Sequence, residues 1–213
     1  EAGTLRYHSL SKFLKNFPME NNEIWNIVEL DDRIYFQSFS AWFSYDGKMV
    51  RAFRNRQQQP LYFYTQNGHI YTQMIDEDFY EFDGKDFHHL FPRSQVNDDN
   101  VVSLLPDGDD SFLMVTENNG LFRYNGDITP WKTDIDTELK KQRVNRAVMT
   151  NDSIFMIGTV LNGIYAIDRK GHCLWHFNLD NRLDNNTVLG LFCDKDNNVW
   201  AALDDGIAYI HHN

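Results

Sequence analysis

The sequence predicts an all-β fold built from repeated antiparallel units, and three observations support this prediction. Gly120, Gly163 and Gly206 are spaced 43 residues apart, and each leads into a short apolar strand. Asn, Asp and Gly residues typical of tight turns recur about every ten residues, which leaves too little chain between them for helices. Aromatic residues make up 15% of the 213-residue chain, and flat rings favour pleated strands.

Each repeat unit contains the same elements in the same order. An Asn-rich segment leads into an apolar strand, as in Asn185-Asn186-Thr187-Val188, and a polar turn then leads to a second strand, as in Val199-Trp200-Ala201. The glycine-led strand is the third, and a fourth follows an Asp-Gly or Asn-Gly turn, as in Asp86-Phe87-His88-His89-Leu90. Four strands in a period of about 40–45 residues are typical of a β-propeller blade.

A two-helix repeat of similar length is the competing architecture, and the frequent turns argue against it. Only residues 137–143 have a helical pattern, of one or two turns. We therefore expect about twenty short strands and almost no helix.

We count five blades in one propeller domain or fragment that spans residues 1–213. Their predicted ranges are 21–57, 58–95, 96–142, 143–183 and 184–213, and the last holds three strands. Residues 1–10 look like a stray outer strand, since Gly3-Thr4-Leu5-Arg6-Tyr7 resembles Gly171-His172-Cys173-Leu174-Trp175. That strand either completes the last blade and closes a five-bladed ring, or the chain is an arc of a larger propeller.

The composition excludes two classes of function. A net charge of −11 offers no basic face for nucleic acid or for an anionic membrane surface. No apolar stretch approaches the ~20 residues of a membrane helix, and no signal peptide precedes the first repeat, so we expect the chain to be either cytoplasmic or a piece of a larger protein.

We expect Cys173 and Cys193 to be free and buried, because both lie among apolar neighbours.

The last repeat, from Asn185 to Trp200 and on to Asp205-Gly206-Ile207-Ala208-Tyr209-Ile210, resembles the two-component regulator propeller repeat. Residues 143–168 also match that pattern, and residues 21–95 match it weakly. The resemblance implies a non-catalytic sensor in the periplasmic, extracytoplasmic part of a bacterial membrane-spanning regulator. The output of such regulators is a hybrid histidine kinase, or a LuxR-type helix-turn-helix domain that follows a triple-tyrosine domain. Contact with the membrane and homodimerisation would then involve other parts of the parent protein.

Three chemical constellations are better explained as turns or surface groups. Asp194, Asp196 and Asn198 have the spacing of a calcium loop with Asp205 at its twelfth position, but Val199 stands where that loop needs glycine. The pairs His88-His89 and His211-His212 would point to opposite faces of a strand, so we predict no metal and no cofactor.

Adjacent carboxylates occur at Glu77-Asp78, Asp98-Asp99 and Asp204-Asp205, but no nucleophile elbow or phosphate loop is present. We predict that this chain is not an enzyme. A glycan-active five-bladed propeller enzyme and a pure protein-docking propeller are the alternatives.

One end of the blades is predicted to bind a ligand. The segment before the first strand and the loop between the second and third strands lie at this end, and they carry aromatic, amide and charged groups. An oligosaccharide or another small molecule is the expected ligand. The candidate binding residues are Trp25, Trp42, Asn119, Arg146, Asn162 and Thr187. We expect Trp200, in a second strand, to be buried between blades.

Overall fold

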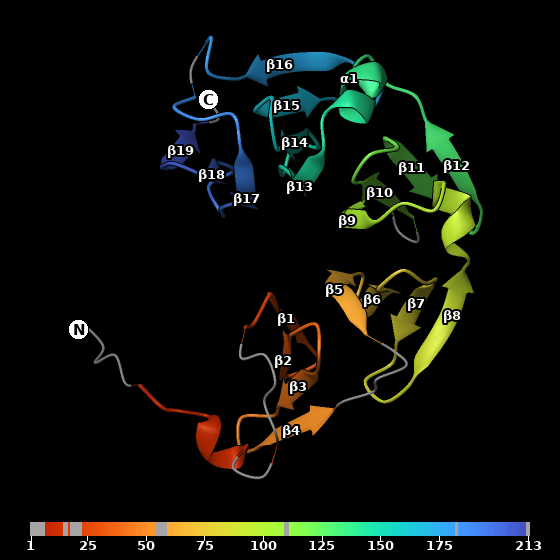
Figure 1. Cartoon of the computed structure of the whole chain (residues 1–213), viewed down its shortest axis with the longest axis vertical. Coiled ribbons are helices and arrows are strands. Elements are labelled where there is room, and N and C mark those ends of the chain that lie inside the picture. Colours follow the sequence, from red (N-terminus) through yellow and green to blue (C-terminus); the bar gives the residue numbers. More distant parts are fainter. Residues whose placement is uncertain are drawn as a thin grey trace. The chain divides into compact units, whose positions relative to one another are not determined.

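The structure is a computed structural model that describes residues 7–14, 17, 23–53, 59–108, 111–181 and 183–211. Five antiparallel sheets follow one another along the chain as the blades of a β-propeller, which confirms the predicted fold class (Figure 1). The described residues contain nineteen strands and one α-helix. The chain divides into two compact units, residues 1–90 and 91–213, called here the N-terminal and C-terminal units, and each is described by itself.

The N-terminal unit holds blades 1 and 2, each a four-stranded meander in sequence order. Blade 1 consists of β1 (Asn26–Leu30), β2 (Arg33–Gln37), β3 (Trp42–Tyr45) and β4 (Val50–Phe53). Blade 2 consists of β5 (Pro60–Gln66), β6 (His69–Met74), β7 (Phe79–Phe82) and β8 (Phe87–Phe91). A 3-10 turn, η1 (Ser11–Phe13), precedes them. The two blades bury a core of four aromatic residues, Tyr35, Trp42, Phe63 and Phe82, together with Ile70.

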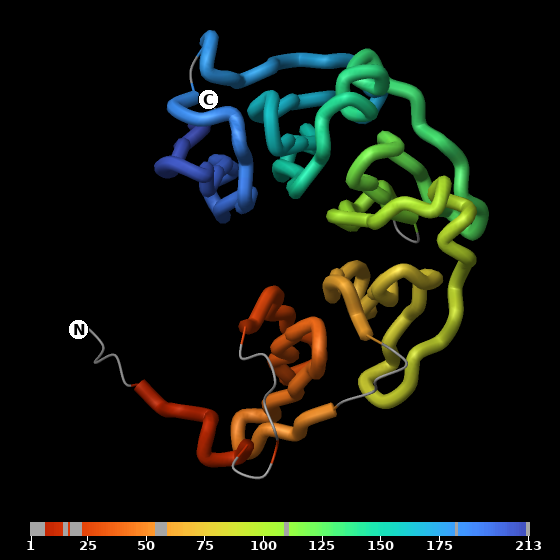
Figure 2. Tube along the Cα trace, viewed as in Figure 1, coloured from red at the N-terminus to blue at the C-terminus, as the bar shows by residue number. Residues whose placement is uncertain are grey.

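The C-terminal unit begins with a 3-10 turn, η2 (Arg93–Val96), and holds blades 3, 4 and 5. Blade 3 consists of β9 (Val101–Pro106), β10 (Phe112–Thr116), β11 (Leu121–Tyr124) and β12 (Ile128–Trp131). Blade 4 consists of β13 (Val144–Met149), β14 (Phe155–Thr159), β15 (Ile164–Ile167) and β16 (Cys173–Phe177). Blade 5 consists, in the part described, of β17 (Val188–Cys193), β18 (Val199–Leu203) and β19 (Ile207–Ile210). Figure 2 shows that each blade is one continuous stretch of the chain.

The faces of neighbouring blades bury each other's apolar residues in the C-terminal unit. Strand side chains alternate between faces, so Phe155 and Ile157 of β14 pack toward blade 3. Met156 between them packs toward blade 5. The helix α1 (Asp136–Lys141) covers the junction of blades 3 and 4 with Leu139, which is fully buried. The helical turn or two expected at residues 137–143 is therefore present, but the helix begins one residue earlier and ends two residues earlier than expected.

Two burial predictions are wrong. Trp200 is 43% exposed, because its side chain lies on the face of blade 5 that points away from blade 4. Cys173 is free but exposed, because it begins the outermost strand β16, while Cys193 is free and half-buried. The predicted outer strand at residues 1–10 falls partly outside the described residues, and residues 7–10 are not in a strand. In the described part of the chain, no helix has both the length and the apolar composition needed to span a membrane.

Candidate ligand-binding face

A backbone hydrogen bond at the same place in every blade marks the end at which the predicted ligand residues lie, although its donor lies before the first strand in blade 1 and after the second strand in blades 2 to 5. It joins the segment before the first strand to the end of the second strand or the loop that follows it. In blade 1 the amide of Trp25 donates to the carbonyl of Gln37, at 2.8 Å. The other four pairs are Ile75 to Gln59, Glu117 to Asn100, Val160 to Arg143 and Asp204 to Thr187. Within each blade, the two segments expected to form a ligand face are therefore adjacent.

An exposed aromatic stack occupies this end of blade 1. The Trp25 ring is 49% exposed and stacks on Phe39, with 5.0 Å between centroids and 24° between planes. Phe39 contacts Tyr62 of blade 2 edge to face at 6.3 Å. The loop that carries Phe39 is fixed by Ser38, whose hydroxyl accepts the amides of Ser40 and Ala41. One flat face of an indole is thus held in place by a second ring beneath it. We call Trp25 and Phe39 the aromatic platform.

Trp42, also a predicted ligand residue, lies in the core of the N-terminal unit. It is 4% exposed and stacks on Phe53 with 3.9 Å between centroids. Phe82 contacts the same ring edge to face at 4.7 Å. As the first residue of β3, Trp42 projects onto the face of blade 1 that packs against blade 2. This ring stabilises the blades and offers no surface to a ligand.

A buried carboxylate, Asp99, organises the same end of blade 3. Its oxygens accept hydrogen bonds from the backbone amides of Asn100, at 2.8 Å, and Asn118, at 2.7 Å. The side-chain amides of Asn118 and Asn119 also donate to it, at 3.2 and 3.0 Å. A buried carboxylate is stable only when such donors replace water. The predicted residue Asn119 therefore holds the loop between the second and third strands in place.

A second buried carboxylate, Glu117, lies next to this network. Asn100 donates to it through its side-chain amide at 3.0 Å, and Arg143 forms an ion pair with it. Asn100 in turn accepts a hydrogen bond from Arg93 at 3.2 Å. Because Asn100 contacts both Asp99 and Glu117, the two carboxylates are linked in one network. A glycosidase needs two converging carboxylates, but here the oxygens of both are engaged by protein donors.

The remaining predicted residues also make structural contacts. Arg146 donates to the carbonyls of Val102 and Asn145, both at 3.3 Å, and the amide of Thr187 donates to Asn185. Asn162 donates to the hydroxyl of Tyr165 at 2.6 Å. Burial raises the pKa of that hydroxyl, so it stays protonated and able to donate.

From the sequence we did not place Phe39, Tyr62, Asp99, Glu117 and Arg143 at this end of the blades, and we noted Asp99 only as one of two adjacent carboxylates. Phe39 had a usable signal, because it is an apolar residue between two serines in a loop of the predicted face. Asp99 had none, because nothing in the sequence distinguishes it from its neighbour Asp98.

The residues with calcium-loop spacing and the described histidines of the two pairs make hydrogen bonds within turns and between neighbouring strands. Asp194 accepts the backbone amides of Asp196 and Asn198, so the segment with calcium-loop spacing is a hairpin turn. His88 contacts Asp83 and His89 contacts Asp78. His211 contacts Asn198, and His212 lies outside the described residues. Among the described residues, no three potential ligands gather to hold a metal.

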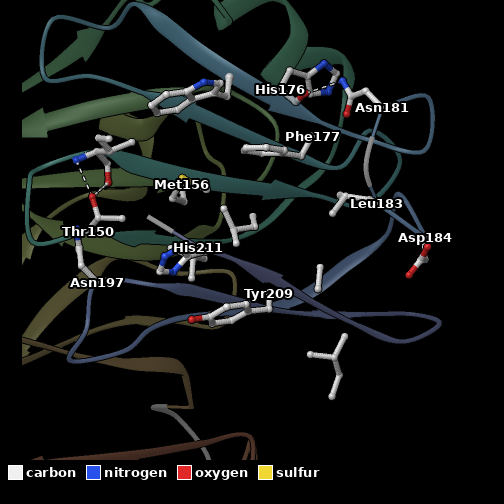
Figure 3. Close-up of a pocket in the computed structure, with 16 residues that line it drawn as sticks. Thr150, Met156, His176, Phe177, Asn181, Leu183, Asp184, Asn197, Tyr209 and His211 are labelled. Carbon is white, nitrogen blue, oxygen red and sulfur yellow. Dashed lines mark hydrogen bonds between the residues drawn. The ribbon is translucent and has the colours of Figure 1, made fainter. Parts of the chain in front are cut away.

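A cavity of about 960 Å³ lies between the outer parts of blades 4 and 5, in the C-terminal unit (Figure 3). Phe177 of β16 and Tyr209 of β19 present rings to it, and His176 lies at one side beside Asn181. Blades 1 to 4 each have a fourth strand paired with the third, whereas β19 is the last described strand of its sheet. The cavity therefore borders the edge at which a fourth strand pairs in the other blades.

No protein-family model matches the chain, and no curated protein matches it. Solved structures do match. The extracellular domain of the putative one component system BT4673 from B. thetaiotaomicron aligns with a TM-score of 0.70 and 19% identity, covering 88% of this chain and 27% of that one. The extracellular domain of the putative hybrid two component system BT3049 from B. thetaiotaomicron has a TM-score of 0.67 and 16% identity, covering 93% and 28%. Virginiamycin B lyase from Staphylococcus aureus has a TM-score of 0.66 and 13% identity, covering 91% and 71%.

At these identities the similarity shows a shared propeller fold. The chain spans about a quarter of the length of the two B. thetaiotaomicron domains. Both are extracellular domains of putative one- or two-component systems, and the similarity to them holds at the level of the fold.

Proposed function

We propose that this chain is a ligand-binding sensor segment from the extracytoplasmic, periplasmic part of a bacterial signal-transduction or transcriptional regulator. The aromatic platform of Trp25 and Phe39 carries the proposal. An exposed indole face that is fixed from below is suited to the apolar C–H face of a sugar ring, and aromatic side chains with a polar handle are enriched at binding surfaces. We therefore propose an oligosaccharide as the ligand.

Two further observations support a binding role over a catalytic one. The carboxylates Asp99 and Glu117 are buried and accept hydrogen bonds or ion pairs from protein groups, so their role is to hold the loops in place. The solved structures of similar fold include extracellular domains of two bacterial regulators. In a parent protein of that kind, ligand binding to the propeller biases an output domain, which is a histidine kinase or a DNA-binding domain.

An oligosaccharide screen with the 213-residue chain tests this proposal. Binding is read by thermal shift, since a ligand at about 100 times its Kd adds about 2.7 kcal/mol to the free energy of unfolding. Trp25→Ala is expected to abolish the shift caused by any hit. The comparison variant is Trp175→Ala, which removes an indole of similar exposure, 51%, from β16, where it lines the cavity between blades 4 and 5.

The two variants separate the possible sites. A hit that survives Trp25→Ala but is lost in Trp175→Ala places the ligand in the cavity between blades 4 and 5, and contradicts the platform. Turnover of a glycan by the wild-type chain contradicts the sensor assignment. A full-length reading frame that lacks both a membrane span and an output domain contradicts the proposal that the chain is part of a membrane-spanning regulator.

A further inference from the structure

A second, smaller cavity lies in the N-terminal unit, at the end of blades 1 and 2 opposite the aromatic platform. It has a volume of about 280 Å³. The β1–β2 turn of blade 1 and the β7–β8 turn of blade 2 border it, through Asp31 and through Asp83, Gly84 and Lys85. Its volume is near the lower limit of ligand pockets, about 300 Å³, so it suits a molecule the size of one sugar ring or smaller.

Two arginines line this cavity, and neither is paired with a residue in the part of the chain that the structure describes. Arg33 begins β2 and Arg51 lies in β4, and both project onto the face of blade 1 that packs against blade 2. Neither guanidinium makes a hydrogen bond or an ion pair with any residue that the structure describes. The third cation, Lys85, is paired with Asp86 at 3.3 Å. An arginine presents a planar fork of donors that fits a carboxylate in a two-point contact.

Two buried hydroxyls lie between the arginines on the same face. Tyr35 and Ser44 are cross-strand neighbours, Ser44 pairs with Arg51, and both are only 3% exposed. The Tyr35 hydroxyl lies 3.6 Å from the place that a Cβ on Gly84 would occupy, so it reaches the neighbouring blade. Neither hydroxyl has a hydrogen-bond partner among the described residues. A hydroxyl can both donate and accept a hydrogen bond, and here the cavity provides the space for a partner.

The carboxylates at the rim do not neutralise the arginines. The Oδ1 atom of Asp83 accepts the backbone amides of Lys85 and Asp86, and its Oδ2 atom contacts His88 at 2.7 Å. Asp31 lies on the exposed β1–β2 turn and forms no ion pair with Arg33. The amides of Met49 and Lys48, which donate to the Oδ1 atom of Asp46, lower the pKa of that carboxyl, and the charge of Arg33 lowers it as well. Acidic groups therefore lie near Arg33, but none of the described ones forms an ion pair with Arg33 or Arg51.

The junction of blades 3 and 4 shows how the protein fills the equivalent place. There Arg123, which holds the strand position of Ser44, forms an ion pair with the carboxylate of Asp107 at 2.9 Å. Arg169, in the turn of the next blade, binds the other oxygen of that carboxylate at 3.3 Å. An internal carboxylate therefore bridges two arginines at this junction. The junction of blades 1 and 2 has its two arginines at other strand positions, and Asp31 of the corresponding turn forms no ion pair with either of them.

We propose that the cavity between blades 1 and 2 binds a small organic carboxylate, held by Arg33 and Arg51 and by the hydroxyls of Tyr35 and Ser44. The ligand's carboxylate takes the place that Asp107 takes in the C-terminal unit. This site is separate from the aromatic platform, and the inference does not depend on the proposed function.

Isothermal titration of the 213-residue chain with D-glucuronate, acetate and D-glucose tests the site. Glucuronate or acetate is expected to bind, and glucose, which has no carboxylate, is not. Arg33→Gln and Arg51→Gln are each expected to weaken binding at least about tenfold, as the loss of a charged hydrogen bond does. The matched control is Lys48→Gln, which removes one positive charge from the β3–β4 turn of the same blade without touching the cavity.

A further variant tests the comparison with Asp107. Ser44→Asp puts an internal carboxylate into the cavity and is expected to abolish binding while circular dichroism shows an intact fold. Trp25→Ala is expected to leave glucuronate binding unchanged, which separates this site from the platform. Absence of binding by both acids overturns the proposal, as do binding of glucose equal to that of glucuronate and full affinity in both arginine variants.

Discussion

The indole Nε1 of Trp200 donates a hydrogen bond to the Oδ2 atom of Asp194 at 2.9 Å, on an open face of blade 5. Its cross-strand neighbours there are Phe192 and Tyr209, which are exposed as well. Met156 holds the equivalent position in blade 4 and is buried, because blade 5 covers it. Among the described residues of the C-terminal unit, no further blade covers the corresponding face of blade 5. The same strand position is therefore core in one blade and surface in the next.

We predict that Trp200→Ala lowers the free energy of unfolding by only about 1 kcal/mol, as partly exposed side chains do. Met156→Ala is expected to cost about 2–4 kcal/mol, because it leaves a cavity in a packed junction. Chemical denaturation of the two variants beside the wild type measures both. A larger loss for Trp200→Ala than for Met156→Ala would mean that the open face of blade 5 is covered in solution.

The strands and turns were predictable because their signals are local. The glycines that mark the repeat have the positive φ angles that disfavour other residues, such as 86° at Gly120 and 101° at Gly206. Each such turn fixes where one strand ends and the next begins. The period of four strands and its assignment to propeller blades follow from these turns alone.

The ligand-face residues were harder to predict, because exposure depends on register and on the neighbouring blade. Trp25 and Trp42 look alike in the sequence, yet one is on the surface and the other is core. A shift of one residue in a strand exchanges its faces. The placement of Arg33 and Arg51 together in the small cavity could not be predicted from the sequence for the same reason, because only the fold brings the two residues to one face.

Two repeat glycines are predicted to respond differently to the same substitution. An alanine at Gly163, where φ is 70°, would place its Cβ 2.0 Å from the carbonyl oxygen of Phe177. At Gly206, φ is 101° and no atom lies within 4 Å of the new Cβ. Gly206→Ala is expected to cost about 1–2 kcal/mol from backbone strain alone. Gly163→Ala is expected to cost roughly 2–5 kcal/mol, because overpacking adds to that strain. Thermal unfolding measures both, and equal losses would show that the clash is relieved by movement of β16.

Asp99→Asn is predicted to destabilise blade 3 much more than Asp98→Asn. Asp99 accepts four N–H groups from Asn100, Asn118 and Asn119, and an amide in its place can accept on one side only. Leaving buried donors unpaired costs about 1–3 kcal/mol. Asp98 is exposed and its φ of 57° is one that asparagine tolerates, so its substitution is expected to be nearly neutral. Denaturation midpoints of the two variants provide the measurement. Similar midpoints would mean that the Asp99 network contributes little.

The pair of Asp83 and His88 is predicted to make the turn between β7 and β8 sensitive to pH. The hydrogen bond to Asp83 raises the pKa of His88 above its ordinary value of 6.5. Backbone amides, that of Asp86 foremost, and His88 hold the pKa of Asp83 below its ordinary value of 3.8. The stabilising contribution of His88 is fully present below pH 6.5 and is lost as the pH rises through its raised folded pKa. That of Asp83 is present above pH 3.8 and is lost as the pH falls through its depressed folded pKa.

An NMR titration of the His88 ring protons measures this effect, with an expected midpoint above 6.5 in the wild type. Asp83→Asn keeps an oxygen for the backbone amides of the turn but removes the negative charge, so it is expected to lower that midpoint. Asp78→Asn is the matched control, because Asp78 contacts His89 on the neighbouring position of β8 and leaves the Asp83 hydrogen bond intact. A wild-type midpoint at or below 6.5, or equal shifts of the His88 midpoint in the two variants, would show that Asp83 does not set the charge of His88 in solution.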